Sequence, residues 1–551
     1  MKFRRPIPLY KEMKYKTLVK KSNRTNQNQH EHERTGTNKD QSQTTPLYTD
    51  LKMNINHIKQ TLGNSSDIVI RDFQAGENGT IHMAVFYTDG LADKTFIQDF
   101  LLKTLMTEIR TANLESNSLN LLHVYDLLKD RSIPVGEIKG ISDFDQLFFH
   151  GLSGDTIILI NGYSKALAVG SRGWAERGVQ EPSSESVVRG PRDGFSETLR
   201  INTALIRRRI KDPNLWIETK QIGKKTKTDV AIIYLKNVAT EKTIEEVRTR
   251  LNRINIDAVL ESGYIEELIQ DKTYSPFPTV YNTERPDTVA AGILEGRIAI
   301  MVDSTPFVLL VPALLVHFFQ ASEDYYQRAD IATLVRILRY FAFFIALLTP
   351  SAYIALTTFH QEMLPTPLLV SLTAQREGVP FPAVVEAVMM EVIFEILREA
   401  GVRMPKAVGS AISIVGALVI GQAAVEAGIV SAAMVIVVSI TAISSFVSPA
   451  FNMAITIRML RFVFIFLAAI SGLFGIIFGV IMLVQHLSSL RSFGIPYLAP
   501  YSPFIFEDQK DAIFRFPHWA LFSRPRLINQ QDITREDTSP PIPSQQEPTN
   551  Q

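Results

Sequence analysis

The sequence predicts an α/β region made of two subdomains, followed by an all-α membrane domain with several spans. Before about residue 298, apolar residues recur in short alternating runs or at helical spacing, as they do in strands and amphipathic helices. After that point, apolar runs of about 20 residues follow one another, and such runs are long enough to cross a bilayer. No apolar core follows the basic N-terminus, so no cleavable signal sequence is expected. We therefore expect a multi-pass membrane protein whose N-terminal region stays in the cytoplasm.

Composition and motifs argue against a catalytic, metal or nucleic-acid site. The formal net charge is +1, with 57 Lys and Arg against 56 Asp and Glu, so no global positive field favours nucleic acid. The chain has no cysteine, which excludes disulfides, thiolate metal sites and cysteine nucleophiles. Its ten histidines show no metal-ligating spacing, and neither a GxxxxGK(S/T) phosphate loop nor a GxSxG elbow occurs. We expect no enzymatic activity, no cofactor and no metal.

Shifts in composition divide the chain into six parts. The polar, basic tail has almost nothing to bury, so it is expected to be disordered, either solvated or in contact with anionic lipid. The parts are the disordered tail 1–48, the first α/β subdomain 49–180, the second α/β subdomain with an arginine-rich joint 181–275, a linker 276–305, the membrane domain 306–488, and a C-terminal tail 489–551 that is disordered from about 528.

Periodicity places the elements of the two subdomains. Helices are expected where apolar residues recur at helical spacing, over 54–63, 94–109, 243–254 and 264–271. Strands are expected where apolar residues alternate or form short runs beside turn residues, over 67–73, 82–90, 155–162, 166–171, 215–223, 229–237 and 297–303.

The membrane domain is expected to cross the bilayer about five times, with the side of the C-terminal tail left open. The expected spans are 331–357, 407–427, 429–446 and 462–487, and residues 306–320 are expected to form an apolar helix that is either interfacial or a further crossing. A helix over 383–400 carries Glu386, Glu391 and Glu395, so it suits the interior or the interface. We expect these glutamates to pair with Arg398, Arg403 or arginines of neighbouring helices.

The helix that starts at Ala407 is the candidate pore-lining element. Small residues recur on it at steps of four, which permits close helix packing and equally leaves room for water and ions. In a symmetric oligomer its polar residues would form rings, and a glutamate ring favours cations. The candidate pore residues are Gly409, Ser410, Ser413, Ala417, Gly421, Gln422 and Glu426.

A charged stretch, "EPSSESVVRGPRDGFSETLRINTALIRRRI", covers residues 181–210 between the two subdomains. Arg189, Arg192 and the start of the following helix could bind an anion. Alternatively, nearby acids neutralise these arginines in pairs such as Arg189–Glu185 or Arg192–Glu197, within or between subunits. We favour a charged joint that fixes domain or subunit geometry. Its residues are Glu185, Arg189, Arg192, Asp193 and Glu197.

Three blocks of sequence resemble the A subunits of the spore germinant receptors. They are "EPSSESVVRGPRDGFSETLRINTALIRRRIKDPNL", "EGRIAIMVDSTPFVLLVPALLVHFFQASEDYY" and "PYLAPYSP", and the resemblance covers about 50–528. It implies a protein of the spore inner membrane that joins a transporter-like B subunit and a lipoprotein C subunit. It also implies that nutrients bind mainly to the B subunit, and that the A subunit forms a homo-oligomeric ion channel whose opening starts germination.

Two classes of function therefore remain. The first is a receptor subunit that forms or gates an ion channel, with 407–428 lining it. The second is a transporter that moves a small solute through its own helices, and a scaffold that anchors partner subunits in the membrane is a weaker option.

Overall fold

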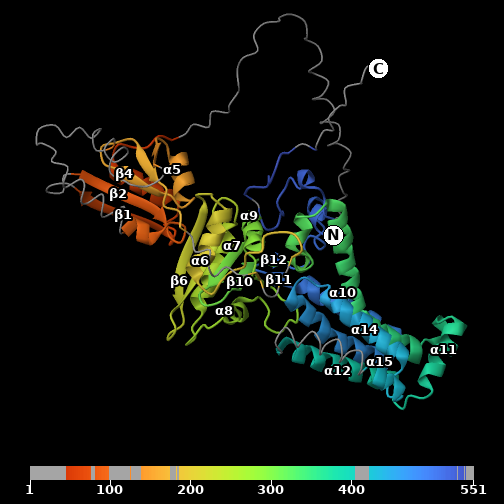
Figure 1. Cartoon of the computed structure of the whole chain (residues 1–551). Coiled ribbons are helices and arrows are strands. Elements are labelled where there is room, and N and C mark those ends of the chain that lie inside the picture. The colour runs from red at the N-terminus through yellow and green to blue at the C-terminus, as the bar shows by residue number, and fades with distance from the viewer. Residues whose placement is uncertain are drawn as a thin grey trace, which may run out of the picture. The chain divides into compact units, whose positions relative to one another are not determined.

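The computed structural model describes residues 45–75, 81–98, 125, 138–173, 181–182, 185, 187–403, 421–529, 531–538 and 540. They form two five-stranded antiparallel sheets with their covering helices, a group of apolar helices, and a C-terminal segment that contains a two-stranded sheet (Figure 1). All contacts below lie within the compact unit that begins at Pro46. Most of the predicted tail, the predicted helix beyond residue 98 and most of the span predicted over 407–427 lie outside the described residues.

The first sheet has the strand order β1-β2-β4-β5-β3. Its strands are β1 (Ile68–Ala75), β2 (Ile81–Thr88), β3 (Ile138–Ile141), β4 (Thr156–Ile160) and β5 (Ala166–Val169). Helices α2 (Leu51–Thr61) and α5 (Phe144–Gly151) begin after Asp50 and Asp143, whose carboxylates accept backbone N–H groups. Apolar side chains of both helices pack on one face of the sheet, and this packing positions the helices.

The second sheet repeats the topology of the first. Its strands are β6 (Leu215–Ile222), β7 (Thr228–Leu235), β8 (Tyr281–Thr283), β9 (Ile298–Val302) and β10 (Val308–Val311), in the order β6-β7-β9-β10-β8. In both sheets, a hairpin is followed by an edge strand, a helix and then two strands that fill the gap. Helix α5 fills this position in the first sheet and α9 (Pro286–Leu294) in the second. The sheet region is thus a structural repeat.

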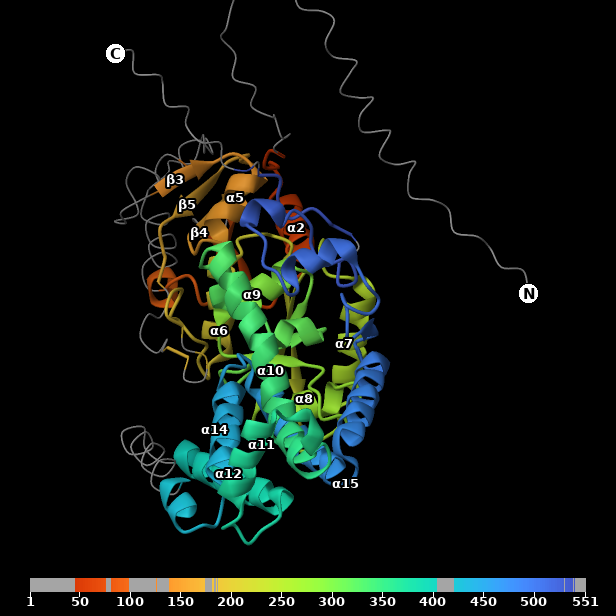
Figure 2. The same cartoon turned by 90° about the vertical axis from the view of Figure 1, so that its right-hand side faces the viewer.

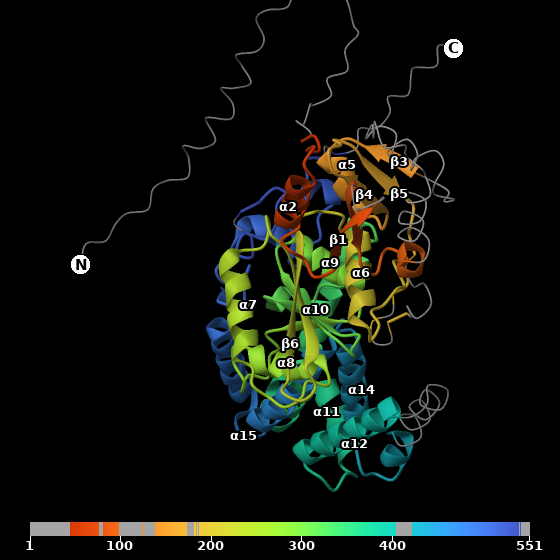
Figure 3. The same ribbon diagram turned by 90° about the vertical axis from the view of Figure 1, so that its left-hand side faces the viewer.

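Helices cover both faces of the second sheet (Figure 3). On one face lie α7 (Glu241–Arg253) and α8 (Ser262–Ile269), whose apolar stripes meet the inward side chains of β7, β9 and β10. On the other face lie α6 (Leu199–Arg209) and α9. Because both faces are buried, β9 and β10 are apolar along their whole length.

The predicted linker 276–305 and the predicted membrane-associated helix 306–320 are both wrong. These residues supply β8, α9, β9 and β10, and then the short 3-10 helices η4 (Leu315–Phe318) and η5 (Ser322–Tyr325). Only the strand expected over 297–303 is confirmed here, as β9. A short apolar run does not distinguish a buried strand from a membrane-associated helix, and in this chain the run is the centre of a sheet.

A buried ion pair joins the two sheets. Arg207 of α6 donates from Nε and Nη2 to the carboxylate of Asp67, at 2.7 Å and 3.1 Å, and both side chains are at most 1 % exposed. Beside it, the Trp216 indole donates to the carbonyl of Thr61 at 3.2 Å. The Trp216 ring lies where a Cβ on Gly63 would stand, so only glycine fits at that turn, whose φ is +61°.

Among the described residues, five helices follow the sheet region and gather together (Figure 2). They are α10 (Ala329–Thr358), α11 (Thr366–Arg376), α12 (Ala383–Arg403), α14 (Ala432–Phe446) and α15 (Phe451–Ser489), with the 3-10 turn η6 (Gln361–Met363) after α10. Among the described residues, α10 and α15 are long and apolar enough to cross a membrane, and α14 is apolar but shorter.

Helix α15 folds back on itself at Gly472, where φ is 59° and ψ is −136°. Thr456 donates to the carbonyl of Pro276 at 2.5 Å, and the His486 ring bonds to Ser275 at 2.9 Å. An unbroken helix would separate residues 456 and 486 by about 45 Å, so both can reach the same loop only in a hairpin. The single helix predicted over 462–487 is therefore corrected to two arms that meet at Gly472.

Two further glycines of α15 let its two arms pack closely after the turn at Gly472. A Cβ on Gly475 would lie 2.2 Å from the carbonyl oxygen of Leu467, and one on Gly479 would lie 2.8 Å from the Phe464 ring. Small residues at these positions let the two arms, 451–471 and 473–489, approach closely.

The C-terminal segment returns to the second sheet. It contains β11 (Arg491–Ser492), β12 (Ile495–Pro496), η7 (Phe506–Asp511) and η8 (His518–Ala520). Ser492 donates to the carbonyl of Thr279 at 2.6 Å, and Thr240 donates to that of Ile528 at 3.0 Å. The chain thus leaves the sheet region through α10 and returns to it after α15. The expected count of about five crossings stays a prediction.

The structure extends the ordered region at both ends beyond the predicted tail boundaries. Pro46 forms a bridge with Asp143, so the ordered region begins within the predicted disordered tail. Ser523 forms a bridge with Thr534, so order continues beyond the predicted limit near 528.

Replacement of Arg207 tests the junction between the sheets. In Arg207→Met, the Asp67 carboxylate stays buried without its partner, so we expect the free energy of unfolding of the full chain to fall by about 3–5 kcal/mol. Arg253→Met, at an exposed position of α7, is the control and should change it by less than about 0.5 kcal/mol. Equal effects of the two variants in denaturant unfolding would show that the ion pair does not hold this junction.

Candidate functional site

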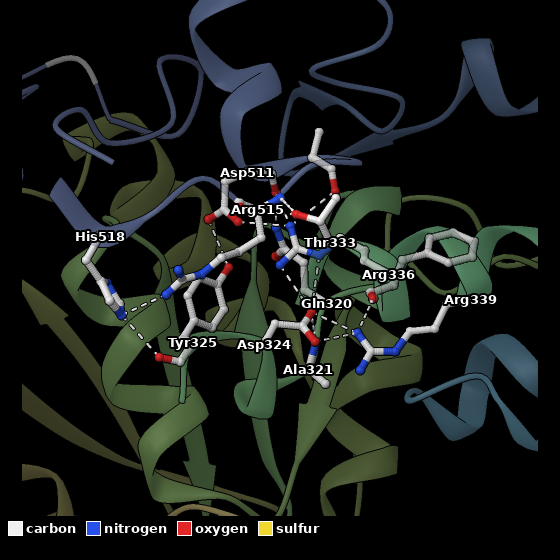
Figure 4. A network of polar contacts seen from close by, with 12 residues as sticks. Gln320, Ala321, Asp324, Tyr325, Thr333, Arg336, Arg339, Asp511, Arg515 and His518 are labelled. Carbon is white, nitrogen blue, oxygen red and sulfur yellow. Dashed lines mark hydrogen bonds and ion pairs between the residues drawn. The ribbon is translucent and has the colours of Figure 1, made fainter. Parts of the chain in front are cut away.

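Two buried arginines mark the beginning of α10, and both are held by Asp324 of η5. Arg336 lies 3.1 Å from the Asp324 carboxylate and Arg339 lies 2.8 Å from it. The exposed fractions of the three side chains are 0 %, 8 % and 2 %. Figure 4 shows both guanidinium groups turned toward the carboxylate. A carboxylate shared by two arginines leaves one positive charge in excess, which requires a second acid.

The C-terminal segment supplies that acid. Asp511 of η7 accepts from Nη1 of Arg336 at 2.9 Å and from the Tyr325 hydroxyl at 2.9 Å (Figure 4). Burial and the neighbouring Asp511 charge raise the pKa of Tyr325 well above its usual value, so this phenol stays protonated and donates. Arg515 adds a backbone bond to Thr333 of α10 at 3.1 Å. We call Asp324, Tyr325, Arg336, Arg339 and Asp511 the α10-base network.

A chain of polar contacts links this network to the arginine-rich joint. Next to Tyr325, the Tyr326 hydroxyl donates to Asp287 of α9 at 2.6 Å, and Arg285 pairs with the same carboxylate at 2.7 Å. Arg285 also donates to the carbonyl of Pro191 at 2.9 Å. Gly190 packs where its missing Cβ would meet the Tyr326 ring. Residues of the joint therefore contact the segment that holds the base of α10.

The acids of the joint pair differently from the sequence-based expectation. The Thr283 hydroxyl donates to the Glu185 carboxylate at 2.6 Å, and Asp193 pairs with Arg209 at 2.6 Å. Glu197 contributes its backbone carbonyl, which accepts from Ser304 at 2.7 Å. Among the ion pairs of the described residues, neither Arg189–Glu185 nor Arg192–Glu197 occurs.

The anion site considered for this stretch is already filled by the protein. Helix α6 begins after Thr198, and its first amide, that of Leu199, donates to the Asp303 carboxylate at 3.0 Å. A carboxylate at this position satisfies the helix N-terminus as an anion would.

Glu185 of the joint has a raised pKa. Burial, only partly offset by the bond from Thr283 and the charge of Arg285, raises its pKa to about 7. The carboxyl group is therefore half protonated near neutral pH, at the point where the joint touches β8.

Ion pairs also hold the apolar helices together. Glu391 of α12 pairs with Arg461 of α15 at 2.5 Å, and Arg461 donates from Nε to the carbonyl of Ala346 in α10 at 2.7 Å. Glu395 pairs with Arg458 at 2.8 Å. This confirms the expected ion-pair role of the α12 glutamates, mostly with arginines of other helices.

Glu386 and Arg403 of α12 also form polar contacts. Glu386 accepts from the Ser431 hydroxyl at 2.9 Å, and Arg376 lies 3.5 Å from it. Arg403 pairs with Glu399 of its own helix at 2.6 Å.

Three of the seven candidate pore residues are described. Gln422 donates to the Glu426 carboxylate at 2.8 Å, and both side chains are exposed. Gly421 is buried, with the position of its missing Cβ 3.6 Å from Val435. Gly409, Ser410, Ser413 and Ala417 lie outside the described residues. In the part of the chain that the structure describes, no cluster of His, Asp and Glu could hold a metal ion.

Arg336 and Arg339 lie within the span expected over 331–357. Their partners come from positions 324 and 511, far apart in the chain, so spacing could not reveal them. The available signal was the burial that an apolar helix imposes on its own arginines, because such charges need partners.

The fold and the buried networks define a class of protein with a two-sheet region coupled to a bundle of apolar helices. Residues 56–527 match the family described as Bacillus/Clostridium GerA spore germination protein. The chain belongs to this family, the A subunits of spore germinant receptors. Membership gives it a role in spore germination as part of a multi-subunit, membrane-associated receptor.

Several relatives match nearly the whole chain. It is 52 % identical to spore germination protein KA of Bacillus subtilis, over 88 % of each chain. It is 46 % identical to the uncharacterized membrane protein YfkQ of Bacillus subtilis, over 90 % of this chain and 96 % of the relative. It is 40 % identical to spore germination protein GerLA of Bacillus cereus, over 87 % and 95 %.

A solved structure is also similar to part of this chain. The crystal structure of the N-terminal domain of the A subunit of the Bacillus megaterium spore germinant receptor GerK3 shares 40 % identity and covers 49 % of this chain and 98 % of its own, with a TM-score of 0.39.

Asp511→Asn tests whether the α10-base network fastens the C-terminal segment. Loss of this charge leaves Arg336 with an incomplete set of partners, so we expect proteolysis of the segment after residue 506 to become at least about tenfold faster. Glu507→Gln removes an exposed ion pair with Arg526 from the same 3-10 helix and should leave the rate within about twofold. If both variants are cleaved at the wild-type rate, Asp511 does not fasten the segment.

Glu185 predicts a pH dependence of stability. Its pKa is about 7 in the fold and about 4.5 in the unfolded chain. Between these values the unfolded chain loses the proton and the folded chain keeps it, so the stability contributed by Glu185 falls as pH rises and then levels off above about 7.

The readout is the difference in unfolding midpoint between the wild type and Glu185→Gln, which cannot titrate. We expect the unfolding midpoint of the wild type to fall relative to that of Glu185→Gln between pH 5 and pH 7.5. A difference that stays constant over this range would contradict the raised pKa.

Proposed function

We propose that this chain forms a homo-oligomeric ion channel, or gates one, within a nutrient-sensing germinant receptor. The observation that carries the proposal is the α10-base network, because it fastens the first apolar helix to the sheet region through buried charges. A movement of the second sheet relative to the bundle would have to break or shift these ion pairs. The network therefore provides a route by which a change in the sheet region reaches α10.

The return of the C-terminal segment supports one orientation for both regions. The sheets and this segment lie on the same side of any membrane that the helices cross, and we propose that this side is the cytoplasm.

The ion pathway is proposed to run along residues 407–428. Gln422 and Glu426 end this stretch, are exposed and bond to each other. Around a symmetry axis each would form a ring, and the carboxylates would attract cations. The ion pairs of α12 with α15 would keep the remaining helices fixed around this element.

The partners follow from the family and are proposed on that ground. They are further copies of this chain, a transporter-like B subunit and a lipoprotein C subunit, together with the membrane lipids. The B subunit is proposed to receive the nutrient, and the joint of Glu185, Arg189, Arg192, Asp193 and Glu197 is proposed to fix the geometry between domains or subunits.

A small-solute transporter and a membrane scaffold are the alternatives. Reconstitution of the purified chain in liposomes separates them, because a channel gives ion flux without saturable solute uptake. Saturable uptake would favour the transporter, and neither flux nor uptake would favour the scaffold.

Glu426→Gln tests the proposed ring. Loss of the carboxylates should reduce the preference for cations over anions by about threefold or more while conduction remains. Glu362→Gln, an exposed glutamate of η6 outside the proposed pathway, is the matched control. Reversal potentials in a potassium chloride gradient give the preference, and an unchanged value in Glu426→Gln would remove this residue from the pathway.

A further inference from the structure

A pocket of about 230 Å³ lies between α9, the segment that contains η4 and η5, and the C-terminal segment. It is distinct from the proposed ion pathway and belongs to the sheet region. Tyr325 and Tyr326 form part of its wall, so the pocket adjoins the α10-base network. Its volume suits a small metabolite and is below the usual range for drug-sized ligands.

Arg297 lines this pocket and has no hydrogen-bond or ion-pair partner among the described residues. The residue is 5 % exposed, and neither Nε nor Nη2 makes a hydrogen bond. Its guanidinium lies 5.6 Å from the centre of the Tyr281 ring, a contact that leaves the N–H groups unused. A buried guanidinium stays charged, and leaving it unpaired is costly, so such a group is retained where something else pairs with it.

His317 offers a second donor to the same space. Its Nδ1 accepts from the backbone N–H of Leu314 at 3.1 Å, so the ring proton of the neutral form lies on Nε2. Burial, and then the charge of Arg297, lowers the pKa of His317 well below its usual value, which keeps the ring neutral. In the described part of the chain, Nε2 has no hydrogen-bond partner.

The acids around the pocket do not satisfy these donors. Asp287 is used by Arg285 and Tyr326. Glu295 faces Arg535 at 3.5 Å, and burial raises its pKa, so it repels an incoming anion less than a free carboxylate would. Among the described residues, neither acid forms a hydrogen bond or an ion pair with Arg297 or His317, although the charge of Glu295 acts on Arg297.

We infer that this pocket binds a small organic molecule through an oxyanion, a carboxylate or a phosphate, held by Arg297 and His317. The planar fork of Arg297 matches two oxygens of either group, and the imidazole N–H can bond to one of them. Binding itself is independent of the proposed channel. Only the further consequence, that an occupied pocket stabilises one position of Tyr325 and Tyr326, rests on the proposed function.

Thermal unfolding of the full chain in detergent tests the site with two probes, sodium acetate and sodium phosphate, at constant ionic strength against sodium chloride. We expect a saturable rise of the unfolding midpoint with at least one oxyanion and none with chloride. A rise with acetate alone assigns a carboxylate, and a rise with phosphate alone assigns a phosphate. No saturable rise with either probe overturns the inference.

Variants of Arg297 separate a binding role from a structural one. Arg297→Met removes an unpaired buried charge, so the ligand-free midpoint should rise or stay equal while the response to the oxyanion is lost. Arg297→Lys keeps the charge without the fork and should weaken binding by about tenfold. Arg328→Met, which removes an 80 % exposed arginine, is the control and should respond as the wild type does.

The opposite results would contradict the site. An unchanged oxyanion response in Arg297→Lys, or in Arg297→Met, would show that the anion binds elsewhere. These readouts do not involve ion flux, so they fail or succeed separately from the proposed channel.

Discussion

The Asp324 carboxylate, buried between Arg336 and Arg339, is the contact on which the arrangement of this protein depends. The three charges come from a 3-10 helix that ends the sheet region and from the first apolar helix, and Asp511 of the C-terminal segment completes the set. None of these groups can be left alone without a cost of several kcal/mol, so three parts of the chain are constrained to stay together. The Tyr326–Asp287–Arg285 contacts extend the constraint to the arginine-rich joint.

Buried ion pairs hold the other junctions as well. Arg207 and Asp67 connect the two sheets, and Glu391 and Arg461 connect the apolar helices. Such pairs add little net stability compared with apolar packing, but they penalise any arrangement that separates the partners. A molecule joined in this way has few intermediate positions, which suits the proposed role of the α10-base network in linking the sheet region to α10.

The sequence indicated the helix and strand patterns well and the junctions poorly. Alternation located strands such as β6 and β7, and the α12 glutamates correctly indicated ion pairs. Residues 306–320 were misplaced because an apolar run is compatible with a buried strand and with a membrane-associated helix. Hydropathy did not predict the hairpin at Gly472, because two equally apolar arms joined by a turn have the same hydropathy as one long helix. Asp511, the second partner of Arg336, lies 175 residues away along the chain, and a single sequence contains no information on which distant residues come together.

A double-mutant cycle on Arg336 and Asp511 tests the central claim most directly. The free energies of unfolding of the wild-type chain, Arg336→Gln, Asp511→Asn and the double variant give the coupling energy between the two side chains. If this ion pair fastens the C-terminal segment to α10, the coupling energy is about 1.5–3 kcal/mol or more, and the double variant loses much less stability than the sum of the single variants. A coupling energy below about 0.5 kcal/mol would mean that the two groups act independently and would contradict the account.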